Sequence, residues 1–289
     1  MLTLFTDTDT DLTPIEAKKY GYKMISMPYL IDKKEIKPYI DFEVFEYEEF
    51  YNLLRKGTLP STCALNPEVY KTYFEEEFKN GNDILYVHFS KAMSGTFNSM
   101  QIAYKELKEK YPERTLYTID TKGITILSLI IVKEVGKLYL EGKSIEEILE
   151  WANNEVDHFA TYFFADDLKF FRRSGRVSNF SGIMGNIIGI KPIIYMDSNG
   201  KMTNIGKEKG RINALKRLVN YVEELGVDLD KRTIIIGHSD ALDLAEKLEE
   251  MLKEKLGNSL NIEFAVVNPT AGSHCGPDCV GVAFYAKHK

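Results

Sequence analysis

The sequence has few cysteines, no long apolar run and no excess of basic residues. Its three cysteines, Cys63, Cys275 and Cys279, are too few and too unevenly spaced for the disulfide framework of a secreted domain. The richest apolar run, residues 124–132, is about half as long as a membrane span, and the first residues lack the basic and apolar regions of a signal peptide. The net charge of −6 argues against nucleic acid as the main partner. We therefore expect a cytoplasmic protein without a transmembrane segment.

The common catalytic motifs are also missing. The chain has no nucleophile elbow, no phosphate-binding P-loop, no dinucleotide-binding glycine pattern and no H-E-x-x-H zinc motif. It offers hydroxyl residues, one histidine in a glycine-rich loop and several arginines, but no convincing acid–base pair. Such a set of side chains suits the binding of an anion better than catalysis.

Three aspartates alternate near the N-terminus, as at the start of a calcium-binding loop. Asp7, Asp9 and Asp11 are followed by Leu12 and Lys18, where that loop requires a glycine at its sixth position and a glutamate at its twelfth. The sequence therefore excludes an EF-hand. Two of these carboxylates could hold Mg²⁺, but we expect them to cap the helix that follows.

The first half of the 289-residue chain alternates short β-rich runs with amphipathic helices, which is typical of βαβ units and a parallel sheet. Thr13-Pro14 gives one helix a cap and a first-turn proline, and Ser144 with Glu147 gives another a capping box. Strands are predicted at residues 2–6, 23–31, 84–89 and 116–120, and helices at residues 14–20, 47–56, 67–80, 99–111 and 124–141 and from residue 144 onward.

The pattern changes after about residue 156. Strands are predicted at residues 159–165, 191–196, 201–205, 233–237, 262–267 and 280–286, and helices at residues 212–225 and 242–256. A turn at residues 197–200 joins two of these strands into a hairpin, which indicates an α+β arrangement with mixed or antiparallel pairing. We predict an α/β fold of two domains, with a parallel sheet in residues 1–155 and an α+β domain in residues 156–289.

Three loops rich in hydroxyl residues are candidate ligand sites, because ligands bind parallel α/β sheets at the carboxyl ends of the strands. The first is residues 6–11 (Thr-Asp-Thr-Asp-Thr-Asp). Residues 94–96 (Ser-Gly-Thr) stand at a helix start, where hydroxyls and free backbone amides form an anion site. A plain N-cap explains the same residues. Residues 60–63 (Pro-Ser-Thr-Cys) lie between two helices, and Thr62 taken alone fits a turn or a cap.

A fourth loop, residues 268–281, is dense in glycine and proline between two predicted strands. This composition lets the backbone approach a ligand closely, with His274 as a positioned donor. A solvent-facing loop histidine is the alternative. His274, Cys275 and Cys279 have no second ligand pair at zinc spacing elsewhere, so we expect no metal site.

Arginines cluster just after two aspartates at positions 166 and 167. Guanidinium groups bind oxyanions bidentately, so Arg172, Arg173 and Arg176 suit a phosphate or an acidic protein partner. Composition alone favours a solvated face paired with the two aspartates. The same two interpretations apply to Arg211.

In their order and spacing, these segments resemble the DegV family of bacterial fatty-acid-binding proteins. The resemblance covers nearly the whole chain and rests on Thr6-Asp7-Thr8, Pro60-Ser61-Thr62, Ser94-Gly95-Thr96-Phe97, Asp167-Leu168 with Arg173-Ser-Gly175-Arg176-Val177, Gly189-Ile-Lys191-Pro192-Ile-Ile, Gly210-Arg211 and Gly272-Ser-His274-Cys-Gly276-Pro277. It implies two α/β domains with a long-chain fatty acid between them, its acyl tail in an apolar tunnel. The chain would then be a lipid-binding carrier and not an enzyme.

The resemblance also implies roles for individual residues. Thr62 and Ser94 would bind the fatty-acid carboxylate and His274 would complete the polar end, supported by the loop residues Ser61, Gly95, Thr96 and Gly276. In related proteins a separate kinase subunit phosphorylates the presented carboxylate to an acyl phosphate. The docking surface for such a kinase would be formed by Arg172, Arg173, Arg176 and Arg211. No cofactor or nucleic acid is expected, whereas a transient membrane contact is compatible with the resemblance.

Two segments depart from the family pattern. Residues 63–66 read Cys-Ala-Leu-Asn where the family usually has Ser-Gln-Pro-Ser, and Cys275 and Asp278 intrude among the small residues of the C-terminal loop. The first change could reshape the pocket mouth, and the second puts a negative charge near a carboxylate site. The apolar residues 123–135 and 182–194 fit tunnel walls and ordinary core packing equally well.

Two other functions remain open on the sequence. A hydrolase or phosphotransferase would use Ser94 or His274 as a catalytic group and would need a hydrogen bond between them in nucleophile–base geometry. A lipid-responsive regulatory module would have a protein contact as its only output.

Overall fold

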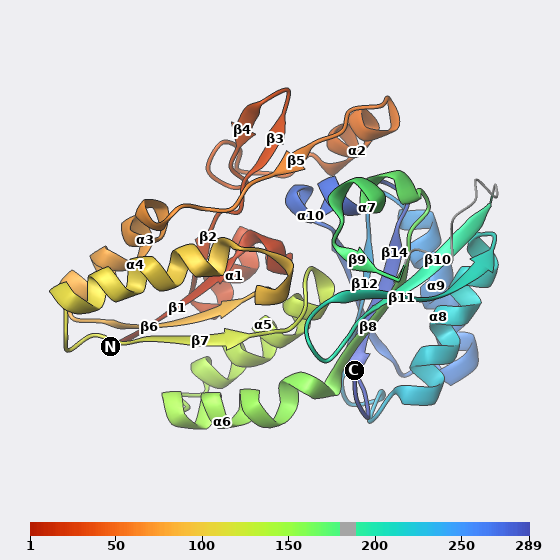
Figure 1. Ribbon diagram of the computed structural model, residues 1–289. Helices are drawn as coiled ribbons and strands as arrows, with labels where there is room; N and C mark the ends of the chain where they lie inside the picture. The colour runs from red at the N-terminus through yellow and green to blue at the C-terminus, as the bar shows by residue number, and fades with distance from the viewer. Residues whose placement is uncertain (180–188) are drawn as a thin grey trace.

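The computed structural model describes residues 1–179 and 189–289, and three β-sheets organise this part of the chain (Figure 1). A four-stranded parallel sheet comes from the N-terminal part, and a seven-stranded mixed sheet comes from the C-terminal part. A small antiparallel sheet lies above both in the view of Figure 1. The predicted α/β class, with a parallel sheet and a mixed sheet, is confirmed.

The parallel sheet has the strand order β2-β1-β6-β7. Its strands are β1 (Leu2–Asp7), β2 (Tyr22–Ile25), β6 (Asp83–His88) and β7 (Leu116–Asp120). Four consecutive residues of β6, 84–87, are buried, as expected of a parallel strand covered on both faces. The covering helices include α3 (Pro67–Lys79) and α4 (Thr96–Lys110), which pack against each other. The carboxyl ends of these strands therefore point toward one common edge.

Two helices begin with the predicted capping boxes. The Thr13 hydroxyl accepts a hydrogen bond from the Glu16 amide at the start of α1 (Pro14–Tyr20), and Ser144 does the same for Glu147 in α6 (Ile145–Glu155). Helix α1 ends at Gly21, whose φ of +78° is a left-handed conformation that glycine adopts without strain. The local signals in the sequence thus correctly set these helix boundaries.

The mixed sheet has the order β13-β12-β14-β8-β10-β11-β9. Its strands are β8 (Phe159–Phe164), β9 (Val177–Ser178), β10 (Ile190–Met196), β11 (Met202–Lys209), β12 (Thr233–His238), β13 (Asn261–Val266) and β14 (Val280–Tyr285). Strands β10 and β11 form the predicted antiparallel hairpin. Tyr162 and Phe164 of β8 belong to the core cluster shared with α8 (Arg211–Leu225) and α9 (Leu242–Leu256). Because side chains alternate along a strand, Thr161 and Phe163 face the opposite, inner side.

Helix α5 (Ile126–Leu140) lies between the two large sheets and contacts β6 on one side and β8, β12 and β14 on the other. Nine of its residues are buried, including seven in the unbroken run 126–132, because the helix has sheet on two sides. One hydrophobic cluster consequently runs from the parallel sheet into the mixed sheet. All strands of the parallel sheet precede residue 155 and all strands of the mixed sheet follow it; the domain division at that residue stays a prediction.

The small sheet corrects the prediction of one strand over residues 23–31. The chain leaves the parallel sheet after β2 and enters the small sheet at β3 (Tyr29–Ile31), which pairs with β4 (Lys34–Ile36) and β5 (Ser61–Thr62). Pro28 separates the two strands, and it has no N–H with which to continue a ladder. The Met27 amide instead donates to the Thr8 hydroxyl at 2.9 Å. Helix α2 (Tyr47–Arg55) packs beside this sheet.

Several short helices position loops between the larger elements. They are η1 (Thr8–Thr10), η2 (Lys91–Met93), η3 (Val156–His158), α7 (Leu168–Ser174) and α10 (Pro269–Cys275). The prediction of a continuous loop over residues 268–281 was therefore wrong for α10. Its start follows ordinary rules, because the Asn268 side chain accepts from the Ala271 amide at 2.9 Å and Pro269 occupies the first turn.

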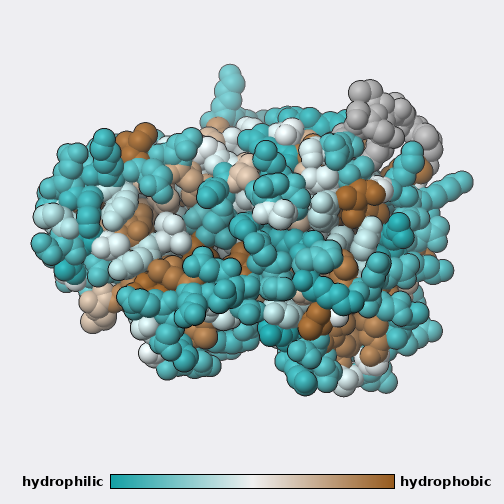
Figure 2. All heavy atoms as spheres, turned by 60° about the horizontal axis from the view of Figure 1, so that its bottom comes forward, coloured by the Kyte–Doolittle hydropathy of each residue, from teal (hydrophilic) through white to brown (hydrophobic). Residues whose placement is uncertain are grey.

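In the part of the chain that the structure describes, no helix is both long and apolar enough to cross a lipid bilayer. Figure 2 shows one face of the molecule, on which hydrophilic residues predominate and hydrophobic residues appear in small separate groups.

Candidate functional site

An internal cavity lies where the carboxyl ends of the parallel strands meet the inner face of the mixed sheet. The space open to the centre of a water-sized sphere is about 100 Å³, and all of its empty space, including open solvent at its mouth, is about 1010 Å³. Apolar side chains form most of its wall; they include Phe89, Met93, Ile124, Ile126, Phe163, Phe171, Met196 and Met202. The three methionines among them are flexible side chains that adapt readily to a ligand.

Thr62 and His274 meet at the wall between this cavity and a smaller groove on the surface, since both residues line both spaces. Strand β5 holds Thr62 opposite Tyr29, and His274 lies in the last turn of α10. The Thr62 Oγ1 and His274 Nε2 atoms are 2.9 Å apart, which is a hydrogen bond. Two residues far apart in the sequence thus form one polar pair.

His274 is neutral in this setting. Burial, and then the nearby positive charges of Arg176 and Arg173, lower the pKa of its imidazole to about 4. A neutral imidazole has one nitrogen that donates and one that accepts. His274 can therefore hydrogen-bond Thr62 with Nε2 without adding a charge, while the positive charge at this wall comes from the arginines. The alternative of a solvent-facing loop histidine is wrong, because the side chain is mostly buried on a helix.

Ser94 lines the same cavity from the loop between η2 and α4. Its hydroxyl oxygen accepts a hydrogen bond from the Thr96 amide at 3.2 Å, which leaves the hydroxyl proton available to a ligand. Within the described residues, no hydrogen bond joins Ser94 to His274. The nucleophile–base geometry that an enzyme would require is therefore not seen.

Thr96 and Gly95 have structural roles beside Ser94. The Thr96 hydroxyl accepts from the Leu65 amide at 3.2 Å and lies 2.9 Å from the Tyr70 hydroxyl. These bonds fix the chain that follows Thr62 against the start of α4. Gly95 is the N-cap residue of α4 and makes no side-chain contribution.

Ser61 directly precedes Thr62, and Gly276 follows His274 by two positions. Gly276 has a φ of +76°, and a Cβ atom there would come within 2.2 Å of the Phe170 ring. Glycine at this position therefore lets the end of α10 approach α7. Ser61 is exposed and lines the surface groove, not the cavity.

The four predicted docking arginines have different surroundings. Arg173 donates to the Pro60 carbonyl oxygen at 2.7 Å and so supports the segment that carries Thr62. Arg176 lines both the cavity and the groove, whereas Arg211 donates to Asp166 at 2.8 Å. Arg172 is exposed on α7. Arg173 and Arg176 thus flank the polar pair, and the docking role of the four arginines stays a prediction.

The departures from the family pattern have local explanations. Asp278 accepts a hydrogen bond from Arg55 at 2.7 Å and lies 3.5 Å from Arg211, so two guanidinium groups balance its charge. Cys275 and Cys63 do line the cavity. Asp278 therefore does not place an unbalanced charge beside the polar pair, whereas the two cysteines alter the cavity surface.

The expectation that the N-terminal aspartates cap the following helix was wrong, because Thr13 caps α1. Asp7 caps the short helix η1 and also accepts hydrogen bonds from the Tyr86 hydroxyl (2.9 Å) and the Phe89 amide (3.2 Å). Burial raises the pKa of Asp7 to about 7, although these hydrogen bonds oppose the shift.

Asp11 ties the N-terminal loop to α10. One of its carboxyl oxygens accepts from both the backbone amide and the side-chain amide of Asn268, at 2.9 and 2.7 Å. Burial raises the pKa of Asp11 to about 7 as well. Over the described residues, no group of three or more histidine, cysteine or carboxylate side chains is arranged to hold a metal ion.

Asp9 is a cavity residue from the candidate loop 6–11, although the sequence did not single it out as a ligand-binding residue. It lines the cavity close to the start of α5, where the Thr125 amide donates to its carbonyl oxygen at 2.8 Å. The available signal was its position, because a polar loop directly after a buried parallel strand lies at the ligand-binding edge of a sheet. The alternating pattern suggested calcium ligands or caps and concealed this signal.

The two segments predicted as tunnel walls differ in their relation to the cavity. From residues 123–135, Ile124, Thr125 and Ile126 line the cavity, and most of the rest is buried core. Of residues 182–194, residues 182–188 lie outside the described part of the chain, and residues 189–194 are not part of the cavity wall. The hydrophobic residues Phe163, Phe171, Met196 and Met202 form wall surface that the sequence pattern did not distinguish from core.

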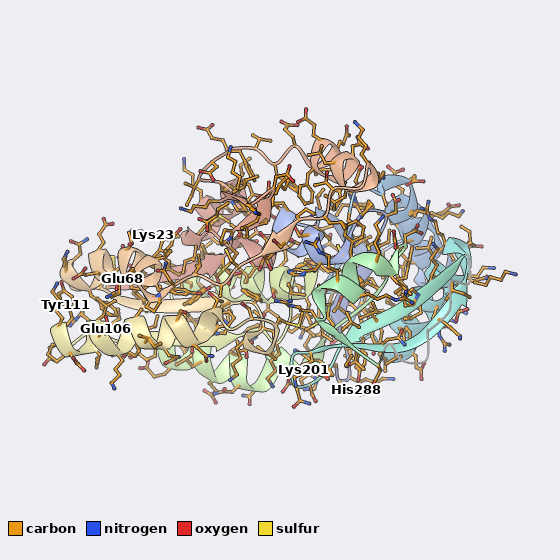
Figure 3. The ribbon with its side chains drawn as sticks, turned by 45° about the horizontal axis from the view of Figure 1, so that its top comes forward. Lys23, Glu68, Glu106, Tyr111, Lys201 and His288 are labelled. Atoms are coloured by element: carbon orange, nitrogen blue, oxygen red, sulfur yellow. The ribbon has the colours of Figure 1, made fainter. Side chains whose placement is uncertain are left out.

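A second surface groove, between α3 and α4, is charged on both sides. Lys71 bridges Glu68 and Glu106 there, at 2.6 and 2.7 Å. Figure 3 shows Glu68, Glu106 and Tyr111 at one end of the molecule, far from Lys201 and His288 beside the mixed sheet. The residues that line this groove do not line the cavity, and the groove is a network of surface ion pairs.

Known proteins resemble this chain over its whole length. The family model described as "Uncharacterised protein, DegV family" matches residues 1–287. A DegV domain-containing protein of Clostridium perfringens is 35% identical over 286 residues, which cover 99% of this chain and 98% of that protein.

Solved structures of DegV family proteins also match this chain over nearly its whole length. The fatty acid binding DegV family protein of Streptococcus agalactiae is 26% identical, with a TM-score of 0.83, and the match covers 100% of this chain and 99% of that one. A DegV family protein of Thermus thermophilus, solved as a fatty acid binder, is 22% identical with a TM-score of 0.84 and 99% coverage of both chains.

Proposed function

This chain belongs to the DegV family, and on that premise we propose that it binds a long-chain fatty acid in the internal cavity. The carboxylate is held by Thr62, Ser94 and His274, and the acyl tail lies among the apolar side chains of the cavity wall. The observation that carries the proposal is the convergence of these three polar residues on one cavity whose remaining wall is mostly apolar. Relatives that were solved as fatty acid binders have the same fold.

The energetics of an acyl chain favour such a cavity. Burying about 14 methylene groups at about 0.8 kcal/mol each gives a gross driving force near 11 kcal/mol, before the cost of ordering the chain. Phe163 and Phe171 from the mixed-sheet side and Met93 from the parallel-sheet side supply the apolar surface that this transfer needs. The binding energy therefore comes mainly from the tail.

The carboxylate needs compensation, because a buried charge without hydrogen bonds costs several kcal/mol. The hydroxyls of Thr62 and Ser94 can each donate one hydrogen bond, and Arg176 provides positive charge at the same wall. The low pKa of His274 makes its imidazole a neutral partner that orients Thr62. The site thus binds the ionised headgroup with neutral donors and a flanking cation.

The proposal extends to presentation of the fatty acid to a separate kinase that forms an acyl phosphate. Support comes from the position of Thr62 and His274 between the cavity and the surface groove, since a headgroup held there lies next to the surface. The groove is flanked by Arg173 and Arg176, and together with Arg172 and Arg211 these arginines offer a basic surface for an acidic partner. The chain supplies the substrate in this scheme, and the kinase supplies the nucleotide chemistry.

Charge reversal of one arginine separates docking from lipid binding. Arg172 is exposed on α7, whereas Arg176 lines the cavity. We expect Arg172→Glu to raise the KM of the kinase for the loaded carrier several-fold, because rim charges steer association, while the fatty-acid content stays unchanged. Arg176→Glu should raise the KM and also lower the fatty-acid content, because Arg176 lines the cavity. An Arg172→Glu carrier that is phosphorylated with an unchanged KM would contradict docking at this residue.

Native mass spectrometry of the chain purified from cells tests the proposed function. The expected result is a mass increase equal to one fatty acid of 14–18 carbons, which is lost on denaturation. An unliganded mass together with no uptake of added palmitic acid would refute the proposal.

A further inference from the structure

One carboxyl group in the cavity wall has no role in the proposed fatty-acid site. The Asp9 side chain is 5% exposed, and its Oδ1 atom has no hydrogen-bond partner among the described residues. Asp9 also lines the cavity. Buried polar atoms are nearly always hydrogen-bonded in folded proteins. Asp11 also has an unpartnered carboxyl oxygen, but of the two residues Asp9 lines the cavity, where a group that the cavity receives can meet it.

Thr125 lies beside Asp9 and adds a hydroxyl to the same part of the wall. Its backbone amide donates to the Asp9 carbonyl oxygen at 2.8 Å, which keeps the two residues together. Thr125 precedes the 15-residue helix α5, but its side chain makes no capping hydrogen bond. We call these two residues the inner polar pair.

Two other cavity threonines differ from the inner polar pair. The Thr161 hydroxyl donates to the Val282 carbonyl oxygen at 3.0 Å, and the Thr270 hydroxyl donates to the Met27 carbonyl oxygen at 2.7 Å. Both hydroxyl protons are therefore already used by the backbone. The inner polar pair retains hydrogen-bonding capacity that the fold itself does not use.

The state of the Asp9 carboxyl indicates which ligand group fits it. Burial, and then the charges of Asp7 and Asp11, raise its pKa well above the ordinary value, which favours the neutral carboxylic acid over the carboxylate. A neutral carboxylic acid donates through O–H and accepts through C=O. A ligand hydroxyl also donates and accepts, whereas a cation needs an ionised carboxylate. The hydroxyl is the better match.

We propose that Asp9 and Thr125 form a second binding subsite, which selects long-chain fatty acids carrying a hydroxyl group on the acyl chain over unsubstituted acids. The subsite rests on the proposed fatty-acid function, because the chain must enter the cavity to reach it. In an otherwise apolar wall, a hydroxyl without a partner weakens binding, and a hydroxyl that meets Asp9 strengthens it. The position of the preferred hydroxyl reports the distance along the acyl chain between Thr62 and Asp9.

The test is a displacement assay with stearic acid and a positional series of monohydroxy 18-carbon acids. For the wild-type chain, we expect one position, or two adjacent ones, to bind roughly three- to tenfold more tightly than stearic acid. Asp9→Leu should reverse this preference and leave stearic acid binding equal or tighter, which also shows that the variant is folded. Asp9→Asn keeps a donor and an acceptor and should retain part of the preference. Thr125→Val, which is nearly isosteric, should reduce it.

The outcomes separate this subsite from the proposed function. If the wild-type chain binds stearic acid but prefers no hydroxylated isomer, or if the preference survives in Asp9→Leu, the subsite is refuted and the carrier function stands. If the wild-type chain binds none of the acids, the proposed function fails and the subsite fails with it.

Discussion

The outer polar site, made of Thr62, Ser94 and His274, and the inner polar pair, Asp9 and Thr125, belong to one cavity but have opposite electrostatic surroundings. At the outer site, arginines and burial keep His274 neutral and leave net positive charge nearby. At the inner pair, burial and neighbouring carboxyls raise the pKa of Asp9 and so favour its protonated form. The outer site is therefore suited to an ionised headgroup, and the inner pair is suited to neutral polar groups. The same burial thus has different consequences, depending on which charges surround the buried group.

The largest expected effect comes from removing the hydroxyls of the outer site. Thr62→Ala combined with Ser94→Ala should weaken fatty-acid binding roughly a hundredfold or more, because hydrogen bonds to a charged group contribute about 1.5–3 kcal/mol each. The measurement is the Kd for palmitic acid by displacement of a fluorescent analogue. Thr72→Ala is the matched control, since Thr72 is exposed on α3 and its hydroxyl bonds only to the Glu68 carbonyl oxygen. Ligand retention equal to wild type in the double variant would contradict the site.

The next effect concerns the carboxyls near the inner pair. The pKa of Asp11 is about 7 in the folded chain and about 3.8 when unperturbed. The folded state therefore holds more protons than the unfolded state between these values, and stability falls as pH rises from about 4 to 7. Asp11→Asn removes this loss and keeps an acceptor for Asn268, so we expect it to raise the free energy of unfolding at pH 8 by roughly 2–4 kcal/mol.

Urea unfolding of lipid-free protein at pH 8 and at pH 4.5 measures this difference. The gain from Asp11→Asn should be largest at pH 8 and much smaller at pH 4.5. An equal gain at both pH values would show that Asp11 is not protonated in the native state.

A smaller effect of opposite sign is expected at the outer site. Because burial and the two arginines lower the pKa of His274 from 6.5 to about 4, the folded state holds fewer protons than the unfolded state in this window. Stability therefore falls as pH decreases from about 6.5 to 4. His274→Gln should remove about 1–2 kcal/mol of the stability difference between pH 7 and pH 5. The same unfolding series checks it, and an unchanged pH dependence in the variant would contradict the neutral, buried imidazole.

Local signals in the sequence predicted much of the fold because they act over a few residues. The caps at Thr13 and Ser144 and the apolar run of β6 are such signals. The break at Pro28 was missed although proline carried the information, and α10 was missed because its glycines concealed the cap at Asn268. Signals of this kind do not reveal which loops meet in space.

The candidate site depended on contacts between distant segments. Thr62 and His274 hydrogen-bond across 212 positions of sequence, so only the family resemblance, and no local pattern, placed them together. The position of Asp9 in the cavity wall is likewise set by the packing of α5 against η1. Its pKa depends on that packing, and a sequence pattern cannot show burial of this kind.

The position of the fatty-acid headgroup is the central claim, and a crystal structure of the chain purified with its bound lipid tests it most directly. The account predicts electron density for one acyl chain in the cavity, with carboxylate oxygens about 2.6–3.2 Å from Thr62 Oγ1 and Ser94 Oγ. A carboxylate bound at another place, or an acyl chain that lies outside the cavity, would contradict it.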